Sequence, residues 1–507
     1  MQQALDWLKA NEAQQVKALA DLVAIPSVST DGEHQQELER SAALTCEQMR
    51  AAGLQNVDIL RCGNANPYAY GEWLGAPDKP TVFLYAHHDV QPVHQKDIDE
   101  GKWHSPPWTL TEREGRLYGR GSADDKGAIA VQLGAIAAFL KTGGDLPVNV
   151  KMLVEGEEEV GSSNLNRFFE EQKERIKADV IVVCDTENID TGIPSITYSL
   201  RGIVAMQVDV ESATKPVHSG MAGGMLADAA IALNVLLSRL YGKNGKLPIP
   251  GIYDKVRKLT AKERKTFKGL PGNDAKWRKE MGVLDGVNFA MAKGVHPYEQ
   301  TWRLPSATII ALEASSIKGA SNQVLPKASA IVSCRIVPDQ NPDEVYEQVK
   351  NYLTKDPPWG VKVTVKPAGS VGWWMTDPNG PAFEAALKAL KAGYGEKPVA
   401  IGCGGSIGFV GPLAELFGGA PAIMLGIEDP KTNAHAPDES LDAGDFRKLM
   451  ASLAYLFENL GKLAPDGVKA APKVEKQEPI PVNPPEGEAR KPEPEIAPQE
   501  AEVGGPP

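Results

Sequence analysis

The chain has 507 residues, of which 54 are Lys or Arg and 66 are Asp or Glu, so its formal net charge is −12. The acidic balance excludes binding to nucleic acid through a general basic surface, and no apolar run approaches the ~20 residues that span a bilayer. The five cysteines are scattered and odd in number, and the first residues lack the basic and apolar regions of a signal peptide. These features predict reduced thiols and a cytoplasmic location.

Short apolar runs alternate with helical patterns over much of the chain. Runs of this kind, bounded by turn residues, are typical of strands that are buried on both faces of a sheet. The sequence therefore predicts an α/β layer with a mainly parallel sheet and helices on both faces. Expected strands lie at 81–86, 148–154, 178–184, 398–403 and 421–427, and expected helices at 35–52, 125–141, 163–177, 381–393 and 444–463.

The middle of the chain follows a different pattern. An alternating strand at 195–211 begins a βαββαβ order, which is a ferredoxin-like signature. We therefore predict an inserted α+β domain over 195–372, between a first catalytic part at 1–194 and a second at 373–464. The further elements are helices at 225–240 and 342–354, strands at 306–314, 328–337 and 360–366, and a basic loop-and-helix excursion at 243–303.

The last segment, 465–507, differs from both. It contains 11 prolines among 43 residues, with Glu, Lys and Ala between them and no aromatic residue. Such a composition cannot bury enough apolar surface to offset the entropy of ordering, so a disordered tail is predicted. A tether or docking peptide is the functional alternative to a solvated appendage.

Residue types that bind metals follow four of the five predicted strands. His87 and Asp89 end the first, Glu158 and Glu159 follow the second, Asp185 follows the third, and His435 lies eight residues after the last; Asp124 stands at a helix start. Ligands of open α/β sheets bind beyond the carboxyl ends of the strands, so these side chains are expected to converge.

A site of histidines and carboxylates without cysteine suits zinc, manganese or cobalt. Paired metal ions in aminopeptidases clamp the scissile carbonyl and activate water, and a spare carboxylate beside a ligand can take the proton. Adjacent Glu158 and Glu159 offer one ligand and one base, provided that the backbone turns there, since neighbours on an extended segment point to opposite sides. Each residue alone could be structural, for example a helix cap at Asp124.

The order of motifs resembles the dinuclear zinc metallopeptidase family of carnosinase, cytosolic nonspecific dipeptidase, succinyl-diaminopimelate desuccinylase, glutamate carboxypeptidase and aminoacylase. The pattern is most similar to the carnosinase-like dipeptidases over residues 1 to about 464. The matching motifs are YAHHDVQP (85–92), LYGRGSADDKG (117–127), EGEEEVGS (155–162), CDT (184–186), VHSG (217–220), NQVLP (322–326), CRIVP (334–338), GGSI (404–407) and TNAHAPDE (432–439).

The resemblance implies two metal ions, with zinc preferred and manganese or cobalt as alternatives. It implies that His87 and Asp185 bind one ion, that Glu159 and His435 bind the other, and that Asp124 bridges them. Two further residues receive roles in the reaction: Asp89 orients the imidazole of His87, and Glu158 is the general base that later protonates the leaving amine.

The resemblance also assigns the inserted domain as a lid that forms a homodimer. His218 is implied to reach the partner's site and to stabilise the oxyanion. Arg335 is implied to bind the substrate carboxylate in a bidentate fork, although a structural ion pair is the alternative. Asn322 or Gln323 could donate to substrate, and Gly405 and Ser406 could either shape its pocket or form a plain turn.

One departure from the carnosinase-like pattern bears on the substrate. Members of that group commonly carry an Arg and an acidic residue before the GGS motif, where the acid recognises a free amino terminus; here Gly402 and Cys403 stand there. The expected activity is hydrolysis of an amide beside a free carboxylate. The substrate is therefore a dipeptide or short peptide, or an N-acyl (succinyl or acetyl) amino acid.

Two readings of other classes remain open. The segment 404–408 matches G-x-S-x-G, and Ser406 is followed by Asp429 and His435 in the order of a serine hydrolase. The Gly-Pro at 411–412 argues against the helix that should follow such a serine. A non-catalytic binding protein could use Arg335 to hold an acidic ligand, but such a protein should have lost a ligand or the base.

Overall fold

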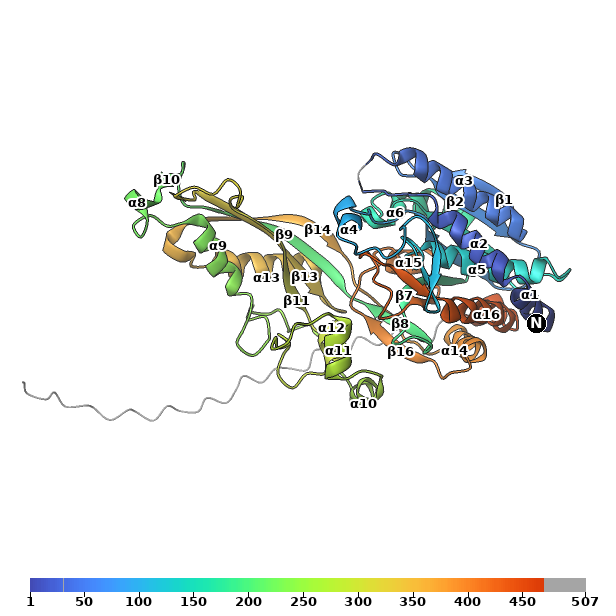
Figure 1. Ribbon diagram of the computed structural model, residues 1–507. Coiled ribbons are helices and arrows are strands. Elements are labelled where there is room, and N and C mark those ends of the chain that lie inside the picture. Colours follow the sequence, from blue (N-terminus) through green and yellow to red (C-terminus); the bar gives the residue numbers. More distant parts are fainter. Residues whose placement is uncertain (31, 469–507) are drawn as a thin grey trace, which may run out of the picture. The chain divides into compact units, whose positions relative to one another are not determined.

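The structure is a computed structural model, and it describes residues 1–30 and 32–468. Its largest sheet has nine strands, in the order β1-β2-β6-β3-β7-β17-β8-β15 with β16 paired to β8 (Figure 1). These strands are β1 (Gln55–Leu60), β2 (Tyr68–Trp73), β3 (Thr81–His87), β6 (Asn149–Glu155), β7 (Val180–Glu187), β8 (Ser195–Leu200), β15 (Trp374–Met375), β16 (Val399–Cys403) and β17 (Ala422–Glu428).

The centre of this sheet is parallel, and its edges are antiparallel. Strands β6, β3, β7 and β17 are parallel neighbours, whereas β1 with β2, β2 with β6, β17 with β8 and β8 with β15 pair antiparallel. In the parallel register, His87 of β3 lies beside Glu155 of β6. The predicted mainly parallel α/β sheet is confirmed, and its carboxyl ends are brought to one edge.

Strand β3 shows why helices cover both faces of the sheet. Its side chains alternate, so that Val82 and Leu84 enter one apolar cluster and Phe83 and Tyr85 enter another. The first cluster takes in α1 (Gln2–Ala10), α2 (Glu12–Val23), α3 (Gln35–Ala52), α5 (Lys126–Leu140), α14 (Pro381–Tyr394) and α16 (Ala443–Leu460); the second takes in α6 (Leu165–Glu171) and α15 (Val410–Leu416).

A four-stranded antiparallel sheet in the middle of the chain has the order β11-β13-β9-β14. Taken in chain order, its strands are arranged 2-3-1-4, which is the ferredoxin-like pattern that the sequence predicts. Helices α9 and α13 pack on one face through a separate apolar cluster. The elements are β9 (Gly202–Glu211), α9 (Ala229–Ser238), β11 (Ser306–Glu313), β13 (Lys327–Ile336), α13 (Pro342–Thr354) and β14 (Lys362–Val371).

Smaller elements complete the part of the chain that the structure describes. Strands β10 (Val217–His218) and β12 (Gln323–Val324) form a two-stranded sheet, and β4 (Thr111–Arg113), β5 (Arg116–Tyr118) and β18 (Ser440–Asp442) a three-stranded one. The remaining helices are α4 (Gln95–Asp99), η1 (Glu158–Val160), α7 (Lys173–Ile176), α8 (Ser219–Ala222), α10 (Ala261–Gly269), α11 (Asp274–Glu280), α12 (Pro297–Arg303), η2 (Pro358–Gly360) and η3 (Pro465–Val468).

The segment 195–211, predicted as one strand of the insertion, forms two strands instead. Its first half, β8, pairs with β16 and β17 in the nine-stranded sheet, and its second half, β9, belongs to the four-stranded sheet. Arg201 lies between them. The domain boundaries at 194, 372 and 464 stay predictions; of the predicted tail, 465–468 forms η3 and the rest lies outside the described residues.

No helix within residues 1–30 and 32–468 combines the length and the apolarity that crossing a membrane requires.

Helix α5 is the most deeply enclosed helix beside the large sheet, because every residue from Lys126 to Phe139 is buried. We expect Ile136→Ala to lower the free energy of unfolding by about 2–5 kcal/mol, since it leaves a cavity in a packed core. The matched control is Ile98→Ala on α4, where the side chain is exposed, and it should change stability by less than about 0.5 kcal/mol. Chemical denaturation of both variants checks this; equal losses would contradict it.

Candidate metal centre

The carboxyl ends of the central strands carry a cluster of histidine and carboxylate side chains. His87 is the last residue of β3, Asp185 lies near the end of β7, and Glu159 lies on η1 directly after β6. His435 comes from the loop between β17 and β18, and Asp124 precedes α5. Segments far apart in sequence thus meet because parallel strands end at one edge.

These five side chains form two groups, and Asp124 belongs to both. The groups are His87, Asp124 and Asp185, and Asp124, Glu159 and His435, with ligand atoms within 4.8 Å of one another in each group. His87 Nε2 lies 3.0 Å from Oδ1 of Asp124, and His435 Nε2 lies 3.0 Å from Oδ2. Each oxygen of one carboxylate therefore faces a different imidazole, as in a bridging ligand.

The buried imidazole of His87 tests whether the cluster fits metal ions. Its Nδ1 lies 3.0 Å from the backbone oxygen of Asp89, an acceptor, so Nδ1 carries the proton. Nε2 then presents a lone pair toward Asp124 and has no hydrogen-bond partner, although it is buried. A cation between these two electron-pair donors would satisfy both. Imidazole nitrogen and carboxylate oxygen are ligands of zinc, manganese and cobalt, so the donor set fits.

Asp89 organises the residues around it through both carboxylate oxygens. Its Oδ1 accepts from the backbone N–H of Glu158 at 3.2 Å, and its Oδ2 accepts from that of Glu159 at 3.0 Å and from the hydroxyl of Ser29 at 2.7 Å. These bonds hold the single turn η1, which supplies the backbone turn that adjacent Glu158 and Glu159 require. The same residue orients His87 through its backbone oxygen.

The electrostatics of the cluster reflect a concentration of carboxylates away from water. Burial, with added repulsion from Asp124, raises the pKa of Glu158 and raises that of Glu159 to about 8. Burial also opposes ionisation of Asp124, but the adjacent imidazoles of His435 and His87 hold its pKa well below the usual value. The bond to Asp124 raises the pKa of His435 to about 9. Ligands must lose protons to bind a metal, so cation binding here should release protons.

Glu439 holds the loop that carries Asp124, a role that the sequence analysis did not assign. Its carboxylate is fully buried; it accepts from the backbone N–H groups of Asp124 and Ala123, each at 3.1 Å, and pairs with Arg120 at 2.6 Å. Glu439 lies inside the TNAHAPDE motif, and this motif is the sequence feature that could have pointed to it. Gln91 holds Glu159 similarly, donating from its backbone and side chain at 3.1 and 2.7 Å.

The positions of Ser406, Asp429 and His435 do not support the serine hydrolase hypothesis. Asp429 is held by both terminal nitrogens of Arg116, at 2.7 and 2.9 Å, rather than by His435. His435 Nε2 faces Asp124 and Glu159, and the hydroxyl of Ser406 accepts from Nη1 of Arg335 at 2.8 Å. The three residues of the proposed triad therefore belong to three separate interactions.

The predicted substrate residues fall into two places. Arg335 on β13 meets Ser406 in the turn after β16, beside Gly405. His218 and Gln323 face each other across β10 and β12, and the backbone of Asn322 accepts from the N–H of Ser219. None of the contacts within the described residues joins this second set to the metal ligands. Figure 1 shows β10 and α8 at the end of the four-stranded sheet.

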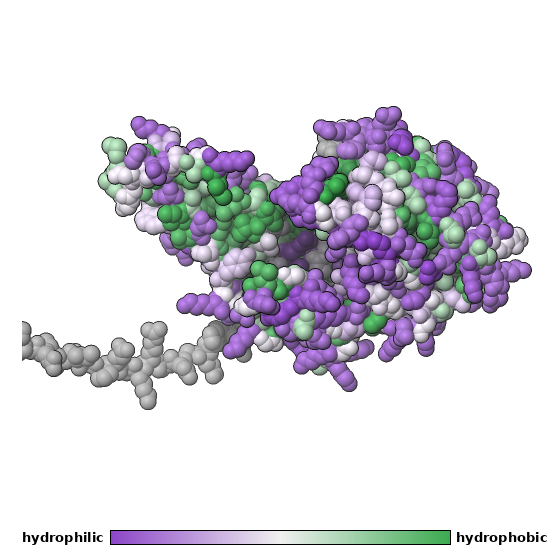
Figure 2. All heavy atoms as spheres, in the orientation of Figure 1, coloured by the Kyte–Doolittle hydropathy of each residue, from purple (hydrophilic) through white to green (hydrophobic). Residues whose placement is uncertain are grey.

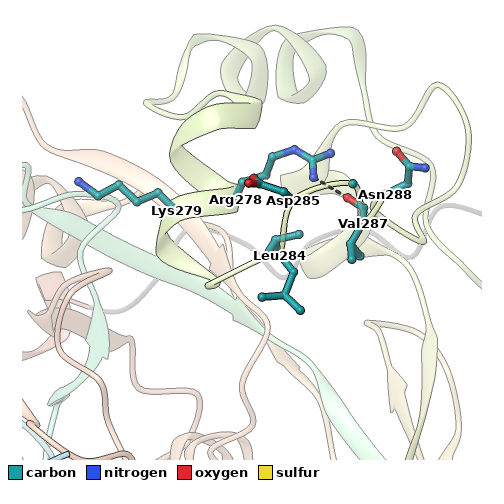
Figure 3. A pocket seen from close by; sticks show the side chains of 8 residues that line it. Arg278, Lys279, Leu284, Asp285, Val287 and Asn288 are labelled. Atoms are coloured by element: carbon teal, nitrogen blue, oxygen red, sulfur yellow. Dashed lines mark hydrogen bonds between the residues drawn. The ribbon is translucent and has the colours of Figure 1, made fainter.

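The excursion at 243–303 holds a hollow of about 460 Å³. Figure 3 shows side chains of Arg278, Leu284 and Val287 around it, with Nη1 of Arg278 donating to the backbone oxygen of Val287 at 2.6 Å. It contains no residue of the metal cluster.

Comparison with known proteins places this arrangement among peptidases. The profile of Peptidase family M20/M25/M40 matches residues 83–459. Cysteinylglycine-S-conjugate dipeptidase of Corynebacterium striatum is 32% identical over 459 residues, which are 90% of this chain and 97% of that protein. Beta-Ala-His dipeptidase of Homo sapiens is 30% identical over 434 residues, covering 82% and 83%. The crystal structure of human carnosine dipeptidase 1 superposes with a TM-score of 0.81 at 28% identity, covering 91% of this chain and 99% of that one.

Neutralising Glu439 should weaken the metal centre without removing a ligand. We expect Glu439→Gln to lower metal affinity by roughly 10–100-fold, the usual effect of losing a group that orients a ligand. Competition with a chelator of known affinity measures this. Glu396→Gln, at an exposed site, is the matched control and should leave affinity unchanged; an unchanged affinity for Glu439→Gln would contradict the assigned role.

Proposed function

The chain belongs to Peptidase family M20/M25/M40, and from this membership we propose that it is a metal-dependent dipeptidase. The observation that carries the proposal is the pair of ligand groups that share Asp124 beside Glu158. The relatives named as dipeptidases support a dipeptide as the substrate.

We propose that His87 and Asp185 hold one divalent ion, that Glu159 and His435 hold the other, and that Asp124 bridges them. Zinc is the proposed metal, because it accepts imidazole and carboxylate ligands together; manganese and cobalt are substitutes. When bound, such a pair of ions polarises the scissile carbonyl and makes water more acidic. The described cluster supports these roles by its two groups of converging ligand atoms.

Glu158 is the proposed general base. Its backbone is held by Asp89, and its carboxylate is not needed in either ligand group, so it is free to handle protons. It takes a proton from the attacking water and later gives one to the leaving amine, as a single carboxylate can in both halves of the reaction. Asp89 acts on the reaction only through His87 and η1.

His218 is the proposed oxyanion donor for a partner subunit. The backbone N–H of Gly220 donates to its Nδ1 at 3.0 Å, so the proton of the neutral ring is on Nε2, which points away from this bond. The side chain is exposed and has no metal ligand beside it in this chain. A homodimer through the predicted lid, 195–372, would bring it to the other site.

Exposed apolar residues on the four-stranded sheet and on its helix α9 support such a dimer. Ile231 and Val235 on α9 and Ile310 and Leu312 on β11 are exposed, although large apolar side chains are usually covered. Figure 2 shows apolar residues gathered over this part of the chain. The edge strand β11 also offers backbone groups for pairing.

Arg335 is proposed to bind the substrate carboxylate, with Ser406 and Gly405 shaping the pocket and Asn322 or Gln323 donating from the partner. A second candidate, deacylation of N-succinyl or N-acetyl amino acids, is favoured by the neutral Gly402 and Cys403.

Five free cysteines support the proposed cytoplasmic location.

Metal removal is the first test of the proposed activity. We expect a chelator to abolish hydrolysis of dipeptides, because both proposed ions are required, and added zinc or manganese to restore it. A panel of dipeptides and N-acyl amino acids, assayed with and without chelator, separates the two candidates. Cleavage of acylated substrates alone would move the function to deacylation, and activity indifferent to chelator would contradict the metal mechanism.

Complementation tests the partner role of His218. We expect His218→Ala to lower kcat by roughly 10²–10³-fold, the size of effect seen for single oxyanion donors, and Glu158→Gln by roughly 10²–10⁴-fold, the size seen for a general base. When the two are coexpressed, a mixed dimer has one site with Glu158 intact and His218 supplied by the partner. Activity should then recover to about a quarter of wild type, from half of the dimers with one working site each. No recovery, with mixed dimers verified by mass, would contradict action across the dimer.

A further inference from the structure

Two arginines beside the GGS turn have no acidic partner among the described residues. The buried arginines Arg116, Arg120 and Arg303 each pair with a carboxylate at 2.6–2.8 Å. Arg201 and Arg335 are half-buried, yet none of the ion pairs within residues 1–30 and 32–468 includes either, and neither is acted on by a carboxylate charge. Burying a cation without a counter-charge is costly, so this pair is expected to serve a ligand.

The two guanidinium groups lie against the same short turn. Arg335 donates to the hydroxyl of Ser406, and Arg201 donates from Nε to the backbone oxygen of Gly404 at 3.1 Å. Arg201 also donates from Nη1 to the hydroxyl of Ser306 at 3.3 Å, and Ser306 faces Arg335 directly in the pairing of β11 with β13.

The positive charges of Arg201 and Arg335 also repel each other. Burial, together with the positive charge of Arg335, lowers the pKa of Arg201 to about 10. Cys403, the residue before the turn, lies near both arginines and supplies no negative charge, because burial raises the pKa of its thiol to about 12. Two cations therefore remain together with only neutral groups between them.

We propose that Arg201 determines specificity by binding a second carboxylate of the substrate, so that the enzyme prefers dipeptides whose carboxyl-terminal residue is Asp or Glu. This inference rests on the proposed function, in which Arg335 holds the main-chain carboxylate. One residue that carries two carboxylates satisfies both guanidinium groups, whereas a neutral residue leaves Arg201 without a counter-charge. Charge-assisted hydrogen bonds of this kind are about twice as strong as neutral ones.

Ala-Glu and Ala-Gln are the substrates that test it, because they have nearly the same shape and differ in charge. We expect wild-type kcat/KM for Ala-Glu to exceed that for Ala-Gln about tenfold, equivalent to about 1.4 kcal/mol. Arg201→Gln should remove this ratio, because it raises KM for Ala-Glu about tenfold more than KM for Ala-Gln. Arg201→Lys should keep part of the ratio, since the charge remains. The exposed Arg40→Gln is the control and should keep all of it.

Cys403→Glu supplies the opposite test by placing a carboxylate beside both arginines. This substitution should lower the ratio of kcat/KM for Ala-Glu to kcat/KM for Ala-Gln, whatever its effect on the two rates themselves. If Arg201 is purely structural, or if it shares the main-chain carboxylate with Arg335, Arg201→Gln should lower kcat/KM for both peptides equally. This result would overturn the proposal. Equal wild-type rates for the two peptides would also overturn it.

A binding measurement separates this inference from the proposed function. Calorimetry of the metal-loaded protein with free glutamate and free glutamine should show glutamate binding about tenfold more tightly, and Arg201→Gln should remove the difference. If no dipeptide is cleaved but this preference holds, the dipeptidase function fails and the Arg201 site stands. If dipeptides are cleaved but the two amino acids bind equally, the Arg201 site fails alone.

Discussion

The centre of the molecule depends on the carboxylate of Asp124, which faces an imidazole with each of its two oxygens. Around it, Asp185, Glu158 and Glu159 bring further acids into a space where burial disfavours their charge. Like charges at such distances cannot all ionise unless cations join them. The cluster is therefore a site that binding of two divalent ions would complete, provided that Asp124 is held in place.

That support comes from elements distant in sequence. Glu439 reaches the Asp124 loop, Asp89 fixes η1, and Arg116 ties down Asp429 at the start of the His435 loop. Each interaction is a buried carboxylate bound to a cation or to backbone N–H groups, which resists rearrangement because loss of either partner is costly. The parallel strands supply the rigid frame on which these loops are mounted.

Much of this frame was predictable because buried parallel strands leave continuous apolar runs and because ligand residues follow their ends. The ferredoxin-like order was also readable. The break at Arg201 was not predicted, because 195–211 alternates throughout apart from the single Gly202, and the pairing of its first half with β16 and β17 is what divides it. Likewise, Glu439 looked like part of a motif without a role, because its partners lie more than 300 residues away. That Arg201 has no carboxylate partner within residues 1–30 and 32–468 depends on which side chains surround it in space, and no sequence pattern reports this.

The most direct test of a centre built on one shared carboxylate is the number of zinc ions bound per chain, measured by elemental analysis after dialysis. The account predicts two ions for the wild type and fewer than one for Asp124→Asn, because both ligand groups lose their common member. Retention of two ions in that variant, or binding of none by the wild type at neutral pH with zinc in excess, would contradict it.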